Sequence, residues 1–310
     1  VKSGPGFQKA DGSELVAVMR RNGDKAKDFA TRHGVPKWYN NADALINNPE
    51  VTAIYIATPP GSHLEYTLKA ATAGKPVYVE KPMARTFEEC QQMIAACATA
   101  KVPLFVAYYR RSLPYFLKVK ELLDSEVIGE LGSANILFFN SQKADDTKPE
   151  IFWRINPEIS GGGHFHDLAS HQFDLLTFLF GDIKKASGMS NRQLIQNGGE
   201  DIVSASFEFE SGLVGSGLWN FTVPKNQTKD EVLIQGSHGS ISFSCFNGDA
   251  PIVLATESGK EEFSLPYPPH VQQPLIQTIV DELSGRGTCP SNGISGAHAN
   301  WVMDAILIGT

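Results

Sequence analysis

Short apolar runs alternate with amphipathic segments over the first third of the sequence. The apolar runs are Leu15–Met19, Ala53–Ala57, Val77–Val79 and Leu104–Ala107. Strands buried inside a parallel sheet are continuously apolar, and strands that alternate with helices are typical of βαβ units. The pattern therefore predicts an α/β fold that begins with a mostly parallel, doubly wound sheet.

Helices are expected between these strands. One is predicted over Asp24–His33, because Asn22 is a suitable N-cap and Gly34 a suitable terminator. The others are predicted at Ala42–Asn47, at His63–Ala73 and after the capping box Thr86-Phe87-Glu88-Glu89.

The pattern changes after about Leu113. A glycine-rich turn, Ser160–Gly163, opens a helix that runs to about Leu179, and short alternating segments begin at Ile183. Alternation indicates an antiparallel sheet with one face solvated or covered by a partner. The predicted elements here are helices at Tyr115–Leu123, Gln272–Leu283 and Ala299–Leu307, and strands at Asn135–Phe139, Ser204–Phe209, Val214–Phe221, Glu231–Ile234, Ser240–Phe243 and Ile252–Ala255.

Length and composition narrow the class of protein. The chain of 310 residues is long enough for two domains, which we place at 1–112 and 113–310. Its net charge of −7 argues against a nucleic-acid partner, and no apolar run reaches the roughly 18–20 residues that span a bilayer. Four cysteines without a CxxC pair, and a start without a signal-peptide pattern, predict a cytoplasmic protein without disulfides.

Two segments follow neighbouring predicted strands, Thr58-Pro59-Pro60 and Glu80-Lys81-Pro82. In open parallel sheets, ligands bind beyond the carboxyl ends of the strands. A lysine held there is partly desolvated and suited to exchanging a proton with a substrate oxygen or polarising it. The alternative is an ordinary solvated lysine at a strand end.

A second candidate cluster lies at the start of the helix after the glycine-rich turn. Asp167 and His171 are four residues apart, so they share a helix face, and a carboxylate beside an imidazole suits a general acid or base. The alternative is a surface ion pair. A metal site that also uses His164 and His166 is disfavoured, because residues two apart point to different sides of a helix.

Arg20 and Arg21 follow the first predicted strand. An arginine after the second strand of a dinucleotide-binding fold accommodates a 2′-phosphate, so the pair favours NADP over NAD unless it is merely solvated. Gly4-Pro5-Gly6 does not complete a phosphate-binding G-x-G-x-x-G, and no strand precedes it. We therefore expect the sequence to start after the first strand and its glycine loop.

Several spaced motifs resemble the glucose–fructose oxidoreductase/inositol dehydrogenase/rhizopine-catabolism (Gfo/Idh/MocA) family. They are Ala57-Thr58-Pro59-Pro60 with His63, Val79-Glu80-Lys81-Pro82-Met83, and Gly163-x-x-x-Asp167-x-x-x-His171. The resemblance implies an N-terminal Rossmann domain and a C-terminal α/β domain that binds substrate. It also implies a large, mostly antiparallel sheet whose open face forms a homodimer or homotetramer interface.

The resemblance also implies roles for individual residues. Lys81 positions or polarises the reacting oxygen, Asp167 assists, and His171 accepts or donates the proton. Residues expected along the cofactor are Thr58, Pro59, His63, Glu80, Lys81, Trp153 and Arg154, together with Arg20 and Arg21. Residues expected around the substrate are Tyr108, Tyr109, Arg110 and His166.

We therefore predict an oxidoreductase that transfers a hydride between NADP, or NAD, and a sugar, polyol or related cyclic alcohol or carbonyl compound. Two alternatives stay open. One is a non-catalytic dinucleotide sensor or regulator on the same fold, and the other is metal-assisted chemistry through the histidine cluster. No metal, membrane or nucleic acid is expected to take part.

Overall fold

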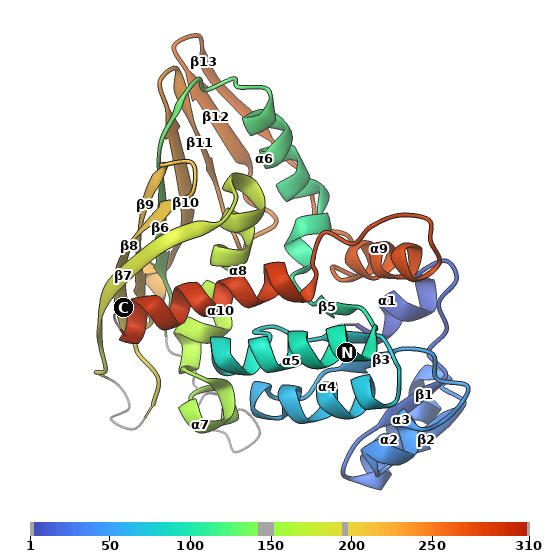
Figure 1. The fold of residues 1–310 in the computed structure, drawn as a ribbon. Coiled ribbons are helices and arrows are strands. Elements are labelled where there is room, and N and C mark those ends of the chain that lie inside the picture. The colour runs from blue at the N-terminus through green and yellow to red at the C-terminus, as the bar shows by residue number, and fades with distance from the viewer. Residues whose placement is uncertain (1–2, 142–151, 194–197, 309–310) are drawn as a thin grey trace.

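The computed structural model describes residues 3–141, 152–193 and 198–308, and the chain begins as layers of helices and short parallel strands (Figure 1). β1 pairs with β2, while β3, β4 and β5 form a separate three-stranded sheet in that order. The elements are α1 (Gly4–Lys9), β1 (Ala17–Met19), α2 (Gly23–His33), β2 (Lys37–Tyr39), α3 (Ala42–Ile46), β3 (Ile54–Ile56), η1 (Pro60–Ser62), α4 (His63–Thr72), β4 (Val77–Val79), α5 (Phe87–Ala100), β5 (Leu104–Val106) and η2 (Tyr109–Ser112).

The rest of the described chain is built on one eight-stranded sheet, in the order β13-β12-β11-β10-β6-β9-β8-β7. Only β6 and β9 pair in parallel within it. The helices and strands of this part of the chain are α6 (Pro114–Asp124), β6 (Leu131–Phe139), η4 (Phe152–Arg154), α7 (Pro157–Ser160), α8 (Gly163–Phe180), β7 (Ile183–Asn191), β8 (Ile202–Phe209), β9 (Val214–Asn220), η5 (Lys225–Gln227), β10 (Lys229–Gly236), β11 (Gly239–Phe243), β12 (Ile252–Thr256), β13 (Gly259–Phe263), α9 (Gln273–Leu283) and α10 (Gly293–Ile308).

The helices α6, α8 and α10 cover one face of this sheet (Figure 1). On β8, Val203, Ala205 and Phe207 are buried, while the intervening Ser204 and Ser206 are exposed. The opposite face is therefore open in the single chain. This alternation is the pattern of a sheet with one buried face. None of the helices in the described ranges has the length and apolar character needed to cross a membrane.

The predicted elements of the first domain are largely confirmed. Asn22 caps α2 by accepting a hydrogen bond from the Lys25 backbone N–H at 3.0 Å, and Gly34 ends the helix with φ 64°. Thr86 caps α5, whereas Glu89 of the predicted capping box accepts from the backbone N–H of Arg85. The side chains therefore direct the chain into these helices as the sequence predicts.

Several predictions were wrong in detail. The run at Leu15–Met19 was expected to be a buried strand, but β1 covers only Ala17–Met19 and is half-buried. The parallel strands form two sheets in the described residues, not the single sheet that was expected. The elements α1, β2, α7, β7 and β13 were not predicted. The sequences of α1, β2 and β13 (GPGFQK, KWY and GKEEF) lack the periodicity of a helix or the apolar character of a strand.

Candidate active site

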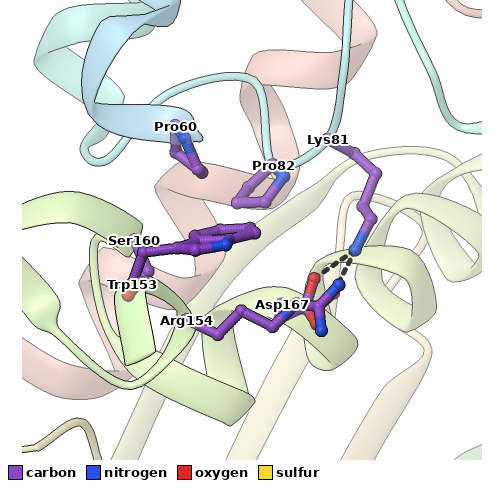
Figure 2. A pocket seen from close by; sticks show the side chains of 7 residues that line it. All are labelled: Pro60, Lys81, Pro82, Trp153, Arg154, Ser160 and Asp167. Carbon is purple, nitrogen blue, oxygen red and sulfur yellow. Dashed lines mark hydrogen bonds and ion pairs between the residues drawn. The ribbon is translucent and has the colours of Figure 1, made fainter. Parts of the chain in front are cut away.

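Lys81 joins the two halves of the described chain. It lies two residues after the end of β4, and its Nζ donates to the backbone oxygen of Asp167 on α8 at 2.8 Å and to the carboxylate of the same residue (Figure 2). The two side chains form an ion pair with only 15% and 27% of their surfaces exposed. The sequence separates the partners by 86 residues, so the fold brings the two predicted catalytic residues together.

The environment keeps Asp167 ionised. Burial alone would raise the pKa of its carboxyl group, but the charge and hydrogen bond of Lys81, and the positive charge of Arg154, together hold the pKa below its usual range. A paired carboxylate in this position fixes the Lys81 ammonium in place, and hydrogen bonds to ionised groups are stronger than neutral ones.

A pocket opens beside this ion pair. Its lining consists of Pro60, Lys81, Pro82, Trp153, Arg154, Ser160 and Asp167 (Figure 2). The guanidinium of Arg154 lies 5.2 Å from the Trp153 ring centroid, and its buried Nε has no hydrogen-bond partner in the described part of the chain. The lining therefore combines flat side chains, which can stack on an aromatic ring, with two cationic side chains, which can bind an anionic group.

This lining agrees in part with the expected cofactor residues. Trp153 and Arg154, two of the residues expected along the cofactor, line the pocket together with Lys81. Pro60 lines it, whereas the expected Pro59 does not, and neither Pro82 nor Ser160 was predicted. Thr58 lies two residues before Pro60, and its buried Oγ1 has no partner in the described residues. The proline-rich turn after β3 therefore reaches the pocket one residue later than the sequence suggested.

His171 lies one helical turn after Asp167 and is 4% exposed. Its ring packs edge-on against Tyr108, Tyr109 and Phe246, with centroid distances of 5.8, 5.5 and 6.0 Å. Two of the expected substrate-pocket residues therefore surround the expected proton acceptor. Phe246 was missed, because it lies in an irregular segment after β11 that no local pattern connects to α8.

Two buried contacts fix the orientation of α8. The carboxylate of Asp174 accepts from Arg111 Nε, with both oxygens at 3.0 Å, and these two side chains are 1% and 6% exposed. Gln172 Oε1 accepts from the indole N–H of Trp219 on β9 at 2.6 Å. These contacts tie α8 to η2 on one side and to the large sheet on the other, so Asp167 and His171 are held at the strand ends.

His63 and Glu80 have structural partners instead of lining the pocket. The His63 ring is fully buried, with Nε2 at 2.8 Å from the Thr58 oxygen and Nδ1 at 3.1 Å from the Met83 oxygen. It therefore links the loops that follow β3 and β4. The Glu80 carboxylate accepts hydrogen bonds from Tyr55 and Gln272, so in this structure neither side chain presents a free polar group to the pocket.

Other predicted residues lie apart from the pocket. Arg110 is 3% exposed, donates from Nε to the Cys245 oxygen at 2.8 Å and stacks on Tyr109 and Phe246. His166 is also buried, and burial lowers its pKa to about 4, so it is a neutral imidazole at pH 7. Arg20 and Arg21 are exposed immediately after β1.

The histidine cluster does not converge. His164 packs against Phe221 with ring centroids 5.4 Å apart, while His166 points into the protein. Among residues 3–141, 152–193 and 198–308, no three His, Cys, Asp or Glu side chains are placed to hold a metal ion.

Two family models and a close relative match the sequence of this chain. Residues 2–108 match the family model described as the oxidoreductase family with an NAD-binding Rossmann fold (Gfo/Idh/MocA), and residues 116–242 match the Gfo/Idh/MocA C-terminal domain. An oxidoreductase of Formosa agariphila, Oxidoreductase P35, is 45% identical over 100% of this chain and 95% of its own length.

More distant relatives have named activities. The 1,5-anhydro-D-fructose reductase of Ensifer adhaerens is 27% identical over 94% of this chain and 87% of its own length. A solved structure of levoglucosan dehydrogenase with NADH and levoglucosan superposes with a TM-score of 0.86, at 24% identity and covering 98% of this chain and 90% of that one, which shows a shared fold. Together, the two family models and the 45% identical relative show that the chain belongs to the Gfo/Idh/MocA family of NAD-binding oxidoreductases.

Proposed function

We propose that this protein catalyses reversible hydride transfer between a nicotinamide dinucleotide and a hydroxyl-bearing carbon of a sugar or related cyclic polyol. The observation that carries the proposal is the ion pair between Lys81 and Asp167 at the pocket, with His171 one helical turn away. The names of two relatives, 1,5-anhydro-D-fructose reductase and levoglucosan dehydrogenase, support a sugar-like substrate.

Each of the three side chains has a distinct role in this proposal. The Lys81 ammonium donates a hydrogen bond to the reacting oxygen and so polarises the carbon–oxygen bond. Asp167 holds that ammonium in place through its backbone oxygen and its carboxylate. His171 takes the hydroxyl proton during oxidation and returns it during reduction. When bound, the nicotinamide cofactor supplies the hydride acceptor or donor for this step.

The cofactor contacts are assigned from the same arrangement. Trp153, Arg154 and the prolines of the pocket would hold the nicotinamide end. Arg20 and Arg21 are exposed after β1, where they would meet a 2′-phosphate, so we propose a preference for NADP. The solved relatives in complex with NAD+ or NADH show that the fold accepts the other cofactor as well.

The open face of the eight-stranded sheet would form the contact in a homodimer or homotetramer. Met189 and Val214 on that face are 78% and 54% exposed. The face lacks a covering layer in the single chain, and a second copy of the sheet would cover both side chains. All four cysteines are free and buried, which supports the proposed cytoplasmic location.

The proposed function is tested by incubating the purified protein with a panel of sugars and polyols, each with NAD+ and with NADP+. The absorbance of reduced nicotinamide is then followed. We expect turnover with at least one cyclic polyol or sugar. Tight dinucleotide binding without turnover across the panel would contradict the proposal and favour a non-catalytic sensor.

A further inference from the structure

The carboxylate of Glu80 is held by three donors immediately before Lys81. Tyr55 Oη donates to Oε1 at 2.5 Å, and Gln272 Nε2 donates to the same oxygen at 2.8 Å. The other oxygen, Oε2, accepts from the backbone N–H of Lys81 at 3.3 Å. One oxygen is therefore fixed by side chains, and the other contacts the backbone that carries the lysine.

The orientation of the Gln272 amide is determined by its surroundings. Its Oε1 accepts from Ser3 Oγ at 2.9 Å and from Tyr78 Oη at 3.3 Å, so its Nε2 must be the group that faces Glu80. Gln272 is 2% exposed and stands at the N-terminus of α9, 192 residues from Glu80. Reversing the amide would set a donor against donors and an acceptor against the carboxylate.

Tyr55 is equally suited to hold the carboxylate. Burial, followed by the charge of Glu80, keeps its pKa well above the usual range, so the hydroxyl stays protonated and donates. Its ring stacks on Tyr78 and packs against Phe7, at centroid distances of 5.0 and 5.1 Å. The hydroxyl is therefore carried by a ring that is itself fixed.

The contacts of Glu80 with Tyr55, Gln272 and the Lys81 backbone help to determine where the Lys81 Nζ lies. The far end of the Lys81 side chain is anchored by Asp167, and its backbone N–H is anchored by Glu80. A long side chain that must present one atom to a substrate depends on both anchors, because loss of either gives it rotational freedom.

We propose that Gln272 and Tyr55 are positioning residues of the active site, which hold Glu80 and through it set the reach of Lys81. The inference rests on the proposed function. It assigns a catalytic consequence to a helix, α9, whose residues do not line the described pocket.

The test compares Gln272→Met and Tyr55→Phe with a matched control, Gln277→Met. Gln277 lies five residues further along the chain and also joins α9 to the N-terminal segment, because its Oε1 accepts from the Asp11 N–H at 2.8 Å. The control therefore removes a comparable long-range contact without touching Glu80. Steady-state kinetics are measured with the best substrate of the panel, and circular dichroism checks that each variant is folded at the assay temperature.

We expect kcat to fall about ten- to a hundredfold in Gln272→Met and Tyr55→Phe, while both KM values change by less than about threefold. Gln277→Met should retain the kcat of the wild type. If Gln272→Met fails to fold, the test uses Tyr55→Phe, which keeps the aromatic packing and removes only the hydroxyl that donates to Glu80.

The inference is overturned if kcat in the folded variants equals that of the control, or if the loss appears in KM alone. An active wild type with unaffected variants overturns this inference and leaves the proposed function standing. A wild type without turnover on any sugar or polyol overturns both.

Discussion

At the scale of single residues, α8 and its surroundings combine charged groups that are paired with neutral groups that are buried. Lys81 and Asp167 exemplify the first kind, and His166 the second. Pairing favours the ionised form of a carboxyl group, whereas burial disfavours the charged form of an imidazole. Both effects lower a pKa, so each makes the free energy of unfolding decrease as pH is lowered, the imidazole at higher pH than the carboxyl group.

The free energy of unfolding should decrease as pH is lowered, partly because of His166. Its pKa is lowered from 6.5 to about 4, so between these values the unfolded state binds more protons than the folded state. The associated stability is complete above pH 6.5 and is lost as pH falls toward 4, by about 3 kcal/mol. Urea denaturation of wild type and His166→Gln at pH 7 and pH 5 should show a smaller pH dependence in the variant. The exposed His238→Gln serves as control, and equal pH dependence in all three proteins would refute the assignment.

Cofactor choice should depend on the exposed pair after β1. Replacing Arg21 with Asp, or Arg20 with Asp, removes a partner for a 2′-phosphate and introduces repulsion. We expect kcat/KM for NADP+ to fall at least about tenfold, with that for NAD+ maintained or raised. Arg32→Asp is the control, because Arg32 is also exposed but pairs with Asp28 on α2. Parallel changes with both cofactors would show that the pair does not select NADP.

At the scale of elements, α8 carries two of the three residues to which we assign the proposed chemistry, Asp167 and His171. The buried pair of Arg111 and Asp174 anchors it to η2. Asp174→Asn leaves the buried guanidinium uncompensated, which should reduce the free energy of unfolding by about 3–5 kcal/mol. Replacing both residues with Met and Leu should cost less than the single change.

Guanidinium chloride denaturation measures this difference. Asp124→Asn, which removes the partner of Lys120 in a surface pair on α6, should cost little and serves as the control. If the double variant is less stable than Asp174→Asn, the explanation by an unpaired buried charge fails.

Secondary structure was predictable where local chemistry determines it. Asn22, Gly34 and Thr86 mark helix ends by their own side chains or conformations, and the structure confirms them. β2 and β13 were not predictable, because Lys-Trp-Tyr and Gly-Lys-Glu-Glu-Phe become strands only through pairing with β1 and β12. Their strand character comes from a neighbour and not from their own residues.

At the scale of the whole molecule, the site exists because segments far apart in sequence meet. The motifs alone indicated Lys81, Asp167 and His171, since they are the residues that carry the family resemblance. No local pattern indicates that Phe246 packs on His171 or that Gln272 holds Glu80, because those contacts depend on how β11 and α9 approach the strand ends. Such contacts follow from tertiary packing and leave no local pattern.

The open face of the sheet predicts an assembly of identical chains. We expect sedimentation velocity to show a dimer or tetramer. Val214→Glu should weaken it, because burying an unpaired charge in an apolar interface is unfavourable. Ile294→Glu is a control, since Ile294 is 74% exposed but lies on α10, away from that face. A monomeric wild type at micromolar concentration would exclude the proposed interface.

The central claim is that Lys81 acts on the substrate and not merely on the fold. The most direct measurement is the turnover of Lys81→Ala with the best substrate of the panel, together with its affinity for the cofactor. We expect kcat to fall by a factor on the order of 10² or more, while the dissociation constant of the cofactor stays close to that of the wild type. A folded Lys81→Ala variant with near-normal turnover would contradict the account.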